Sequence, residues 1–289
     1  VVDWLAGRTS SENGVTAGLL NAYVAHLEEK GYAHKTLSNE LITLKQTVKW
    51  LIKQGHLQRM KPIELSIRKA EGDRAYCYRG EEVRAMIEHC RANEGLHWLA
   101  NVIIALACTG LRIAELVSLR WSDLNFENAR LTLTDETGRP AAEGRKRREL
   151  KSRRSRSFPI HPDLLKVLQG MPRVDAFVFH GPRGGRLKPD TVRRILVREV
   201  IEPLTERFPS ANDEKGFRDG RLHSFRHHFC SVCANRRVPE RMVMEWLGHS
   251  DSEMVRVYYH AHDEVARQQM AGLDFLGGAG GCSAGDVSQ

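Results

Sequence analysis

A polar segment in the first third of the sequence divides the chain into two parts of different character. Residues 61–75 (KPIELSIRKAEGDRA) are rich in charge and contain a proline and a glycine, which is typical of a linker. A chain of 289 residues is long enough for two domains of ordinary size. We therefore expect a small all-α domain, a linker, a larger domain and a flexible, glycine-rich tail, at residues 1–68, 69–76, 77–276 and 277–289 in that order.

Two amphipathic helices are predicted in the first part. Apolar residues recur there at steps of three and four, first over residues 19–27 and then over residues 37–51, as expected for the buried face of a helix. The opposite face of the second helix carries Lys45, Lys49 and Lys53. A row of lysines on a helix is most often a solvated surface, so this pattern alone does not identify a binding site.

The second part combines helices with a few short strands. Helical periodicity recurs in seven segments, at residues 79–91, 96–108, 112–119, 163–168, 190–201, 224–235 and 238–247. Three strand-like segments, residues 123–126, 130–134 and 155–160, predict a small antiparallel sheet with an irregular, basic insert. The expected fold is mainly α with a small antiparallel β-sheet, and the larger domain is of the α+β type.

The charge of the chain favours an anionic partner. The formal net charge is +8 and the pI is near 9.3. Residues 145–156 (RKRRELKSRRSR) concentrate much of the positive charge. An isolated charge run is about as often a solvated loop as a binding surface, so the class of partner has to come from the motifs.

Hydropathy and cysteine usage favour an intracellular protein that does not span a membrane. The apolar stretch at residues 102–108 is far shorter than the ~20 residues needed to cross a bilayer. Six cysteines form no disulfide framework for a chain of this length, and the lone CxxC pair, Cys230 and Cys233, is better explained by buried thiols than by zinc. We therefore expect a cytoplasmic location. The chain begins with Val1 rather than Met, so we also expect that some N-terminal sequence is missing.

Three separated segments carry side chains suited to attack on a phosphodiester. They are GLRIAEL with Arg112, HSFRH with His223 and Arg226, and LGHSD with His249, which Tyr258 follows nine residues later. Such an attack builds negative charge on the phosphate oxygens, and arginine holds these oxygens with a planar, permanently charged fork. A tyrosine hydroxyl can act as the nucleophile when cations and a proton acceptor lie nearby. Each residue alone would more often be a surface or core residue, but their joint occurrence favours a catalytic site.

With these three segments the chain resembles the tyrosine recombinase (phage integrase) family over roughly residues 13–275. The resemblance implies a DNA strand-exchange enzyme in which Tyr258 attacks the scissile phosphate and forms a 3′-phosphotyrosine without a metal. Tyr259 is the rival for this role, and the family's spacing from His249 favours Tyr258. The residues implied to stabilise the transition state are Arg112, His223, Arg226 and His249.

The family also uses a lysine that protonates the leaving 5′-oxygen. This lysine lies on a β-hairpin, eight residues before a proline in the closing strand. Here Lys151 precedes Pro159 by eight residues, and Lys146 is a weaker candidate in the same basic run. The chain carries an extra stretch in the hairpin, residues 135–149, where the family often has only a few residues. The assignment of Lys151 therefore depends on whether this insert shifts the hairpin.

Further expectations follow from the resemblance. Glu115, three residues after Arg112, would brace the arginine and histidine network, the alternative being a simple surface ion pair. The small domain would be a SAM-like, core-type DNA-binding domain, which clamps duplex DNA together with the catalytic domain. Phosphate contacts are expected at Lys45, Lys49, Arg153 and Arg154. A homotetramer would act on two recombination sites, in association with the nucleoid.

No cofactor or metal is expected. The histidines outside the motifs, His227, His228, His260 and His262, form no HExxH or paired Cys/His pattern. Three alternatives remain: a type IB topoisomerase, a catalytically silent DNA-binding relative and a metal-dependent nuclease. The small helical domain and the spacing of the motifs resemble integrases more than a topoisomerase, and the complete set of arginines, histidines, lysine and tyrosine argues against a silent relative. Activity that is insensitive to EDTA would exclude the nuclease.

Overall fold

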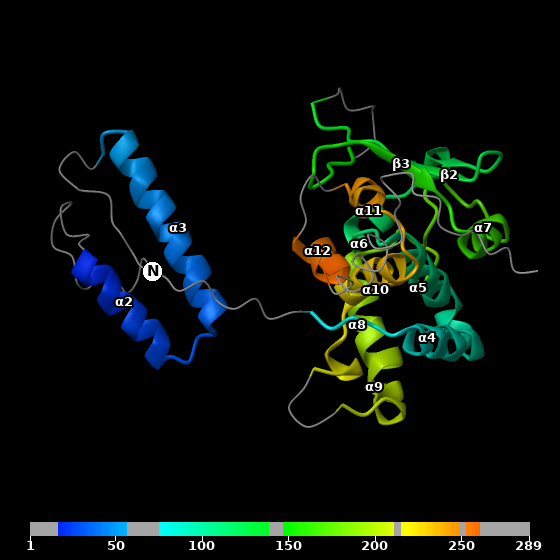
Figure 1. The fold of residues 1–289 in the computed structure, drawn as a ribbon, viewed down its shortest axis with the longest axis horizontal. Coiled ribbons are helices and arrows are strands. Elements are labelled where there is room, and N and C mark those ends of the chain that lie inside the picture. Colours follow the sequence, from blue (N-terminus) through cyan, green and yellow to red (C-terminus); the bar gives the residue numbers. More distant parts are fainter. Residues whose placement is uncertain (1–16, 57–74, 139–146, 211–214, 249–252, 261–289) are drawn as a thin grey trace, which may run out of the picture. The chain divides into compact units, whose positions relative to one another are not determined.

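The computed structural model (Figure 1) describes residues 17–56, 75–138, 147–210, 215–248 and 253–260. The chain divides into two compact units, residues 1–74 and 75–289, and each is described by itself. The glycine-rich tail and nearly all of the predicted linker lie outside the described residues. Within the described ranges, no helix is both long enough and apolar enough to cross a membrane.

The described residues of the first unit form two helices, α2 (Ala17–Glu29) and α3 (His34–Lys53). Tyr23 and Leu37 are buried where these helices pack together. Tyr23 Oη donates a hydrogen bond of 2.7 Å to Glu40 Oε2 on α3. Burial, together with this carboxylate, raises the pKa of Tyr23 to about 12. The two helices predicted from apolar periodicity are therefore present, and each extends a few residues beyond its predicted range.

The second unit is organised around one buried helix, α5 (His97–Thr109). Its leucine, valine and isoleucine side chains are mostly buried, and it packs against α4 (Gly80–Ala92), α7 (Pro162–Gln169) and α10 (Leu222–Asn235). The other helices of the described residues are α6 (Ile113–Leu116), α8 (Pro189–Leu196), α9 (Glu202–Leu204), α11 (Glu240–Leu247) and α12 (Glu253–His260). Short 3₁₀ turns lie at Glu94–Leu96, Trp121–Asp123, Thr205–Arg207 and Phe217–Asp219.

A small antiparallel sheet covers one end of the second unit. Its strands, β1 (Leu124–Asn125), β2 (Arg130–Leu133) and β3 (Arg156–Pro159), lie in the order β1-β2-β3. Leu131 is opposite Leu124 on one side and Phe158 on the other, and all three side chains are buried. The predicted fold class, mainly α with a small antiparallel sheet, is confirmed.

The helix predicted at residues 112–119 is wrong in length, because only the single turn α6 is helical. Arg112 has extended backbone angles and caps this turn. Beyond it, the carbonyl of Leu119 accepts a hydrogen bond of 3.0 Å from Val178 N, so the backbone there pairs with a distant segment. The apolar periodicity at Val117 and Leu119 therefore reflects burial in a turn and a bridge rather than in a helix.

The helix predicted at residues 190–201 is divided by a π-helical turn, Val197–Ile201. Pro203 follows this turn and lacks the N–H that would bond to the carbonyl of Glu199 four residues earlier. That carbonyl accepts instead from His89 Nε2 of α4, at 2.8 Å. The wider turn therefore ties the region between α8 and α9 to α4.

Candidate active site

The end of α5 brings the first arginine segment against two later helices. Gly110 ends this helix in the left-handed conformation, with φ of +60°. A Cβ at this position would lie 2.7 Å from Phe229 Cδ1 on α10 and 2.8 Å from Leu247 Cδ2 on α11. Glycine accommodates both the backbone angle and the close approach. The chain therefore enters α6 directly beside α10 and α11.

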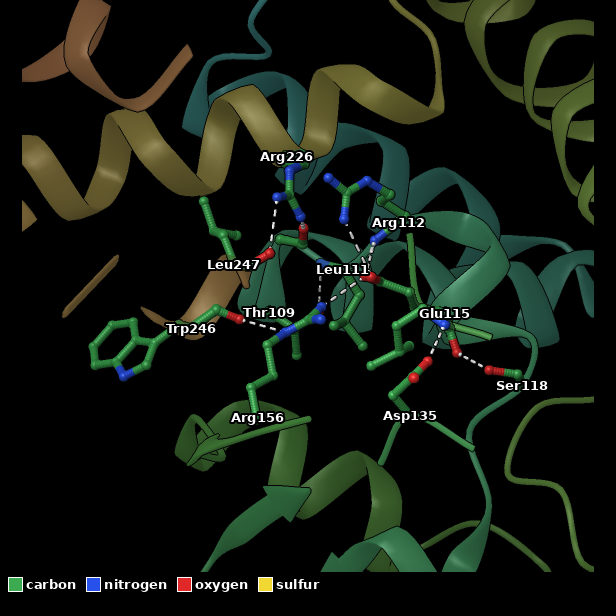
Figure 2. A network of polar contacts seen from close by, with 12 residues as sticks. Thr109, Leu111, Arg112, Glu115, Ser118, Asp135, Arg156, Arg226, Trp246 and Leu247 are labelled. Carbon is green, nitrogen blue, oxygen red and sulfur yellow. Dashed lines mark hydrogen bonds and ion pairs between the residues drawn. The ribbon is translucent and has the colours of Figure 1, made fainter. Parts of the chain in front are cut away.

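Arg112 and Glu115 form the N-terminal cap of α6 and an ion pair in which the carboxylate is buried and the guanidinium is half-buried (Figure 2). Glu115 Oε2 accepts from Arg112 N at 2.9 Å, and Oε1 pairs with Arg112 Nη1 at 3.2 Å. Glu115 Oε2 also accepts from Arg156 Nη2 at 2.8 Å. Burial alone would raise the pKa of the Glu115 carboxyl, but Arg156 and then Arg112 hold it below its usual range. Glu115 therefore carries its negative charge between two guanidinium groups.

Arg226 lies on α10 and is one of the most deeply buried cations of the described residues, with 1% of its surface exposed. Its Nη1 donates to Gly110 O at 2.7 Å, and its Nη2 donates to Leu247 O at 3.1 Å. Burial lowers the pKa of Arg226 to about 10, and the nearby Arg112 acts in the same direction. The guanidinium remains charged at neutral pH and joins the end of α5 to the end of α11.

Arg156 is a third buried guanidinium of the cluster. Its Nε donates to Trp246 O at 2.8 Å, while its Nη1 is buried with no hydrogen-bond partner among the described residues. Arg156 has no predicted role in the sequence, where it stands at the end of the basic run at residues 145–156. The available signal was its alternation with the apolar Phe158 in a predicted strand, which places both side chains on the buried face.

The two guanidinium groups of Arg156 and Arg226 hold the carbonyls of Trp246 and Leu247, the last residues of α11. Gly248 then ends the helix in the left-handed conformation, with φ of +69°, and a Cβ there would lie 2.9 Å from Arg156 Nη1. The next residue, the predicted catalytic His249, lies outside the described residues. Within the LGHSD segment, the structure therefore defines the positions of Leu247 and Gly248, directly before His249.

His223 lies in the first turn of α10, one helical turn before Arg226 and on the same side of the helix. Burial lowers the pKa of His223, and the charges of Arg226, Arg112 and Lys151 lower it further. These four predicted site residues therefore share one electrostatic neighbourhood. The four residues come from three segments, around Arg112, Lys151 and His223, which are more than thirty residues apart in the sequence.

The insert at residues 135–149 is anchored at both of its described ends. Glu136 N donates to Arg148 O at 2.9 Å. The buried Arg148 pairs with Asp123 at 2.5 Å, and Arg120 Nη1 pairs with Glu136 Oε1 at 2.7 Å. The rival lysine, Lys146, lies outside the described residues. Lys151 therefore follows a segment whose position is set by buried ion pairs.

A cavity of about 1090 Å³ lies between α6, the segment that carries Lys151 and the residues that precede α8. Its charged lining includes Arg112, Glu115, Lys151, Arg153, Arg186 and Lys188. Cations outnumber carboxylates along this lining, so the cavity favours an anion. Lys151 is exposed at its wall, where its ammonium group can reach a bound molecule.

The adjacent tyrosines on α12 have different surroundings. Tyr258 Oη lies 3.0 Å from His227 Nδ1 on α10. Tyr259 Oη donates to the carbonyl of Val238 at 2.5 Å, and burial raises the pKa of its phenol. Of the two hydroxyl groups, that of Tyr258 therefore faces the helix that carries His223 and Arg226.

The four predicted phosphate contacts are all exposed. Lys45 and Lys49 lie on α3 in the first unit, and Arg153 and Arg154 lie just before β3 in the second. Arg153 has a positive φ of 49°, which turns the chain between Lys151 and the strand. These side chains are free to reach a ligand from their own unit.

The thiols of the CxxC pair are buried in the interior of the second unit. Burial raises the pKa of Cys230 to about 12 and that of Cys233 to about 11. Both therefore remain protonated at neutral pH. In the described part of the chain, no group of three or more His, Cys, Asp or Glu side chains is arranged to hold a metal ion.

Comparisons with known proteins identify the class. Residues 78–265 match the Phage integrase family, and residues 1–55 match the phage integrase N-terminal SAM-like domain. The chain belongs to the phage integrase family. The predicted class, a DNA-recombining enzyme of the tyrosine recombinase family, is thereby confirmed.

Individual relatives are named tyrosine recombinases. The chain is 26% identical over 247 residues to tyrosine recombinase XerC of Xanthomonas axonopodis pv. citri, which covers 83% of this chain and 72% of that protein. It is also 26% identical to XerC of Pediococcus pentosaceus, over 86% of this chain and 79% of that protein.

Solved structures share the fold. The integrase of transposon Tn1549, in complex with transposon right end DNA, aligns with a TM-score of 0.72 at 21% identity, over 91% of this chain and 87% of that one. A lambda integrase dimer bound to a COC′ core site aligns with a TM-score of 0.59 at 15% identity, over 86% of this chain and 65% of that one.

Proposed function

We propose that the protein cleaves and rejoins duplex DNA at specific sites by transesterification, with Tyr258 as the nucleophile and without a metal. The observation that carries this proposal is the cluster of the buried Arg156 and Arg226 with the half-buried Arg112, in which three guanidinium groups lie close to the carboxylate of Glu115. The cluster adjoins α12, which carries Tyr258, through α10. A fixed excess of positive charge next to a nucleophile suits a reaction that builds negative charge on phosphate oxygens.

In this mechanism, Tyr258 Oη attacks the scissile phosphorus and gives its proton to solvent water as the bond forms. The bond from phosphorus to the 5′-oxygen breaks, which leaves a 3′-phosphotyrosine and a free 5′-hydroxyl. Lys151 gives a proton to the departing oxygen, since its ammonium lies at the cavity wall. The reverse sequence joins a new 5′-hydroxyl and returns the enzyme to its starting state.

The buried cations are suited to hold the transition state. In the free protein, burial removes water from the Arg226 guanidinium, and its pKa is therefore lowered. An incoming phosphate would compensate for this lost solvation. We assign contacts with the non-bridging oxygens to Arg112 and Arg226, assisted by His223 and His249. Glu115 would keep Arg112 and Arg156 in register.

We also propose that several protomers act together on DNA associated with the nucleoid. The matched lambda integrase is a dimer on its core site, which supports more than one protomer for each DNA site. A homotetramer on two recombination sites would then complete strand exchange. Lys45, Lys49, Arg153 and Arg154, all exposed, would contact phosphates of the duplex.

A nicked suicide substrate in EDTA tests the nucleophile. We expect an SDS-resistant protein–DNA complex with the wild type and with Tyr259→Phe. Tyr258→Phe should form none while it still binds the same DNA. An adduct with Tyr258→Phe, together with its loss in Tyr259→Phe, would transfer the role to Tyr259.

The leaving-group role of Lys151 has a separate test. Lys151→Ala should cleave an ordinary phosphodiester slowly, and a 5′-bridging phosphorothiolate should restore much of the rate, because a thiolate leaves without a proton. Lys146→Ala provides the matched control and should behave as the wild type on both substrates. Rescue of Lys146→Ala instead would assign the general acid to Lys146.

A further inference from the structure

His227 has no role in the chemistry described above, yet it is the residue that contacts the Tyr258 hydroxyl. Its Nδ1 lies 3.0 Å from Tyr258 Oη, and the two ring centroids are 6.0 Å apart. His227 is also one helical turn after His223, with the two imidazole rings 5.1 Å apart in an edge-to-face arrangement. It therefore lies between a residue of the second motif and the nucleophile.

The His227 ring is neutral under ordinary conditions. Burial lowers its pKa to about 4, and the nearby His223 and Arg226 act in the same direction. A neutral imidazole accepts a hydrogen bond at one nitrogen and donates at the other. A phenol O–H is a strong donor, so in the tautomer with its proton on Nε2 the His227 ring can accept from Tyr258 Oη at Nδ1.

Other contacts of α12 hold the helix in place, and the Tyr258 ring packs against the same apolar cluster. Val255 is fully buried in a cluster with Phe229 and Val243, which fastens the helix to α10 and α11. Tyr259 Oη is bonded to the carbonyl of Val238. A tyrosine side chain can occupy several rotamers on a fixed backbone, and a polar contact at its hydroxyl adds to the packing and favours one of them.

We propose that His227 is a positioning residue for the nucleophile. By accepting the hydrogen bond of the Tyr258 hydroxyl, it selects the rotamer that keeps this oxygen beside the helix carrying His223 and Arg226. The inference rests on the proposed function, because it takes Tyr258 as the nucleophile. The contact should raise the rate of cleavage rather than the affinity for DNA, because it orients a reacting atom and touches no part of the duplex.

Three substitutions of His227 test this role. His227→Leu removes the acceptor. His227→Asn places an amide oxygen close to the position of Nδ1, whereas His227→Gln places its amide near the position of Nε2. The readouts are the single-turnover cleavage rate on a suicide substrate, the DNA concentration for half-saturation and the thermal unfolding midpoint of each variant.

We expect His227→Leu to cleave about tenfold more slowly than the wild type, with half-saturation unchanged, as for the loss of one neutral hydrogen bond. His227→Asn should recover most of that rate, and His227→Gln should not. Packing alone would give the opposite order, since Gln is closer to His in volume. Wild-type rates in all three variants, equal losses in all three, or a parallel loss of DNA affinity would each overturn the proposal.

Tyr258→Phe on the same substrate separates this inference from the proposed function. If Tyr258→Phe is inactive and His227→Leu cleaves as the wild type does, the positioning role falls and the nucleophile stands. If Tyr258→Phe still forms the covalent complex, the nucleophile assignment falls, and the positioning role falls with it.

Discussion

Arg226 combines two demands that usually conflict, because it is a permanent cation and is almost completely buried. Its hydrogen bonds to the carbonyls of Gly110 and Leu247 compensate part of the cost of burial, and Glu115 is the nearby anion that favours its charge. A group held in this way cannot reorganise when substrate arrives. Its contribution should therefore appear in the transition state more than in the bound ground state.

Replacing Arg112 or Arg226 by Ala should accordingly lower the cleavage rate by a factor on the order of 10²–10³, the range for one lost oxyanion donor. DNA affinity should change much less. Substitution by Lys should rescue only part of the rate, since the two-pronged fork is lost. Single-turnover cleavage and equilibrium binding, measured on the same substrate, compare the two effects. Equal losses of binding and cleavage would make these arginines ordinary DNA contacts.

Glu115 makes stability depend on pH. The pKa of its carboxyl is lower in the folded protein than in the unfolded chain, so its contribution is complete above its usual range near pH ~4.3 and is lost as the pH falls through the folded value. Glu115→Gln should be less stable than the wild type at pH 7 by roughly 3 kcal/mol, because two buried guanidinium groups lose their carboxylate.

Urea unfolding of the two proteins between about pH 7 and about pH 3 measures this difference. The wild type should lose more stability than Glu115→Gln over the acidic part of this range, so that the two curves converge. Curves that remain parallel down to the lowest pH would mean that folding does not lower the pKa of the Glu115 carboxyl.

At the scale of the elements, long periodic helices were the most predictable part of the fold. The helix expected at residues 96–108 is α5, His97–Thr109, and the one expected at residues 224–235 is α10, Leu222–Asn235. Apolar periodicity is sufficient in these cases because each helix buries one broad face. The same signal failed at residues 112–119, where a cap and a distant backbone bridge, which no local pattern encodes, replaced the helix.

The end of α5 provides a test of element packing. Gly110→Ala adds a methyl group into Phe229 and Leu247 at a left-handed backbone position. We expect a loss of roughly 2–4 kcal/mol, of which about 1–2 kcal/mol comes from the backbone conformation and the remainder from overpacking. The cleavage rate should also fall, because the displaced end of α5 leads directly to Arg112, which caps α6.

Gly184→Ala is the matched control for this substitution. Gly184 has a similar φ of +74°, but a Cβ there would meet no atom within 4 Å. It should therefore lose only the conformational part of the stability and keep its cleavage rate. Chemical denaturation of both variants decides the matter, and equal losses would remove packing at Gly110 as the cause.

At the scale of the whole molecule, the sequence indicated which residues of the candidate site lie close together better than it indicated how they are held. The motifs identified Arg112, His223 and Arg226, which the structure brings together. The linking role of Arg156 was missed, because its partners Glu115 and Trp246 are 41 and 90 residues away. A contact of that range depends on how the helices pack, which one sequence does not specify. His249 lies outside the described residues, so its position stays a prediction.

The charge of the intact protein should govern its affinity for DNA. Binding should weaken steeply with salt, since each neutralised phosphate of duplex DNA contributes about 0.9 to the logarithmic slope. In Lys45→Ala/Lys49→Ala, that slope should fall by about 2, while cleavage at saturating DNA remains unchanged. Titrations at several salt concentrations measure the slope. An unchanged slope would assign these exposed lysines to the solvated surface of α3.

The hydrogen bonds from Arg156 and Arg226 to the last carbonyls of α11 connect the stability of this helix end to the geometry of the candidate site. If the end of α11 opens, both guanidinium groups lose part of their support and the path to His249 is released at the same moment. Local opening of this helix end should then be coupled to loss of activity, so that a partly opened molecule would be inactive. Amide hydrogen exchange should accordingly slow at the end of α11 when a phosphate-containing ligand occupies the site.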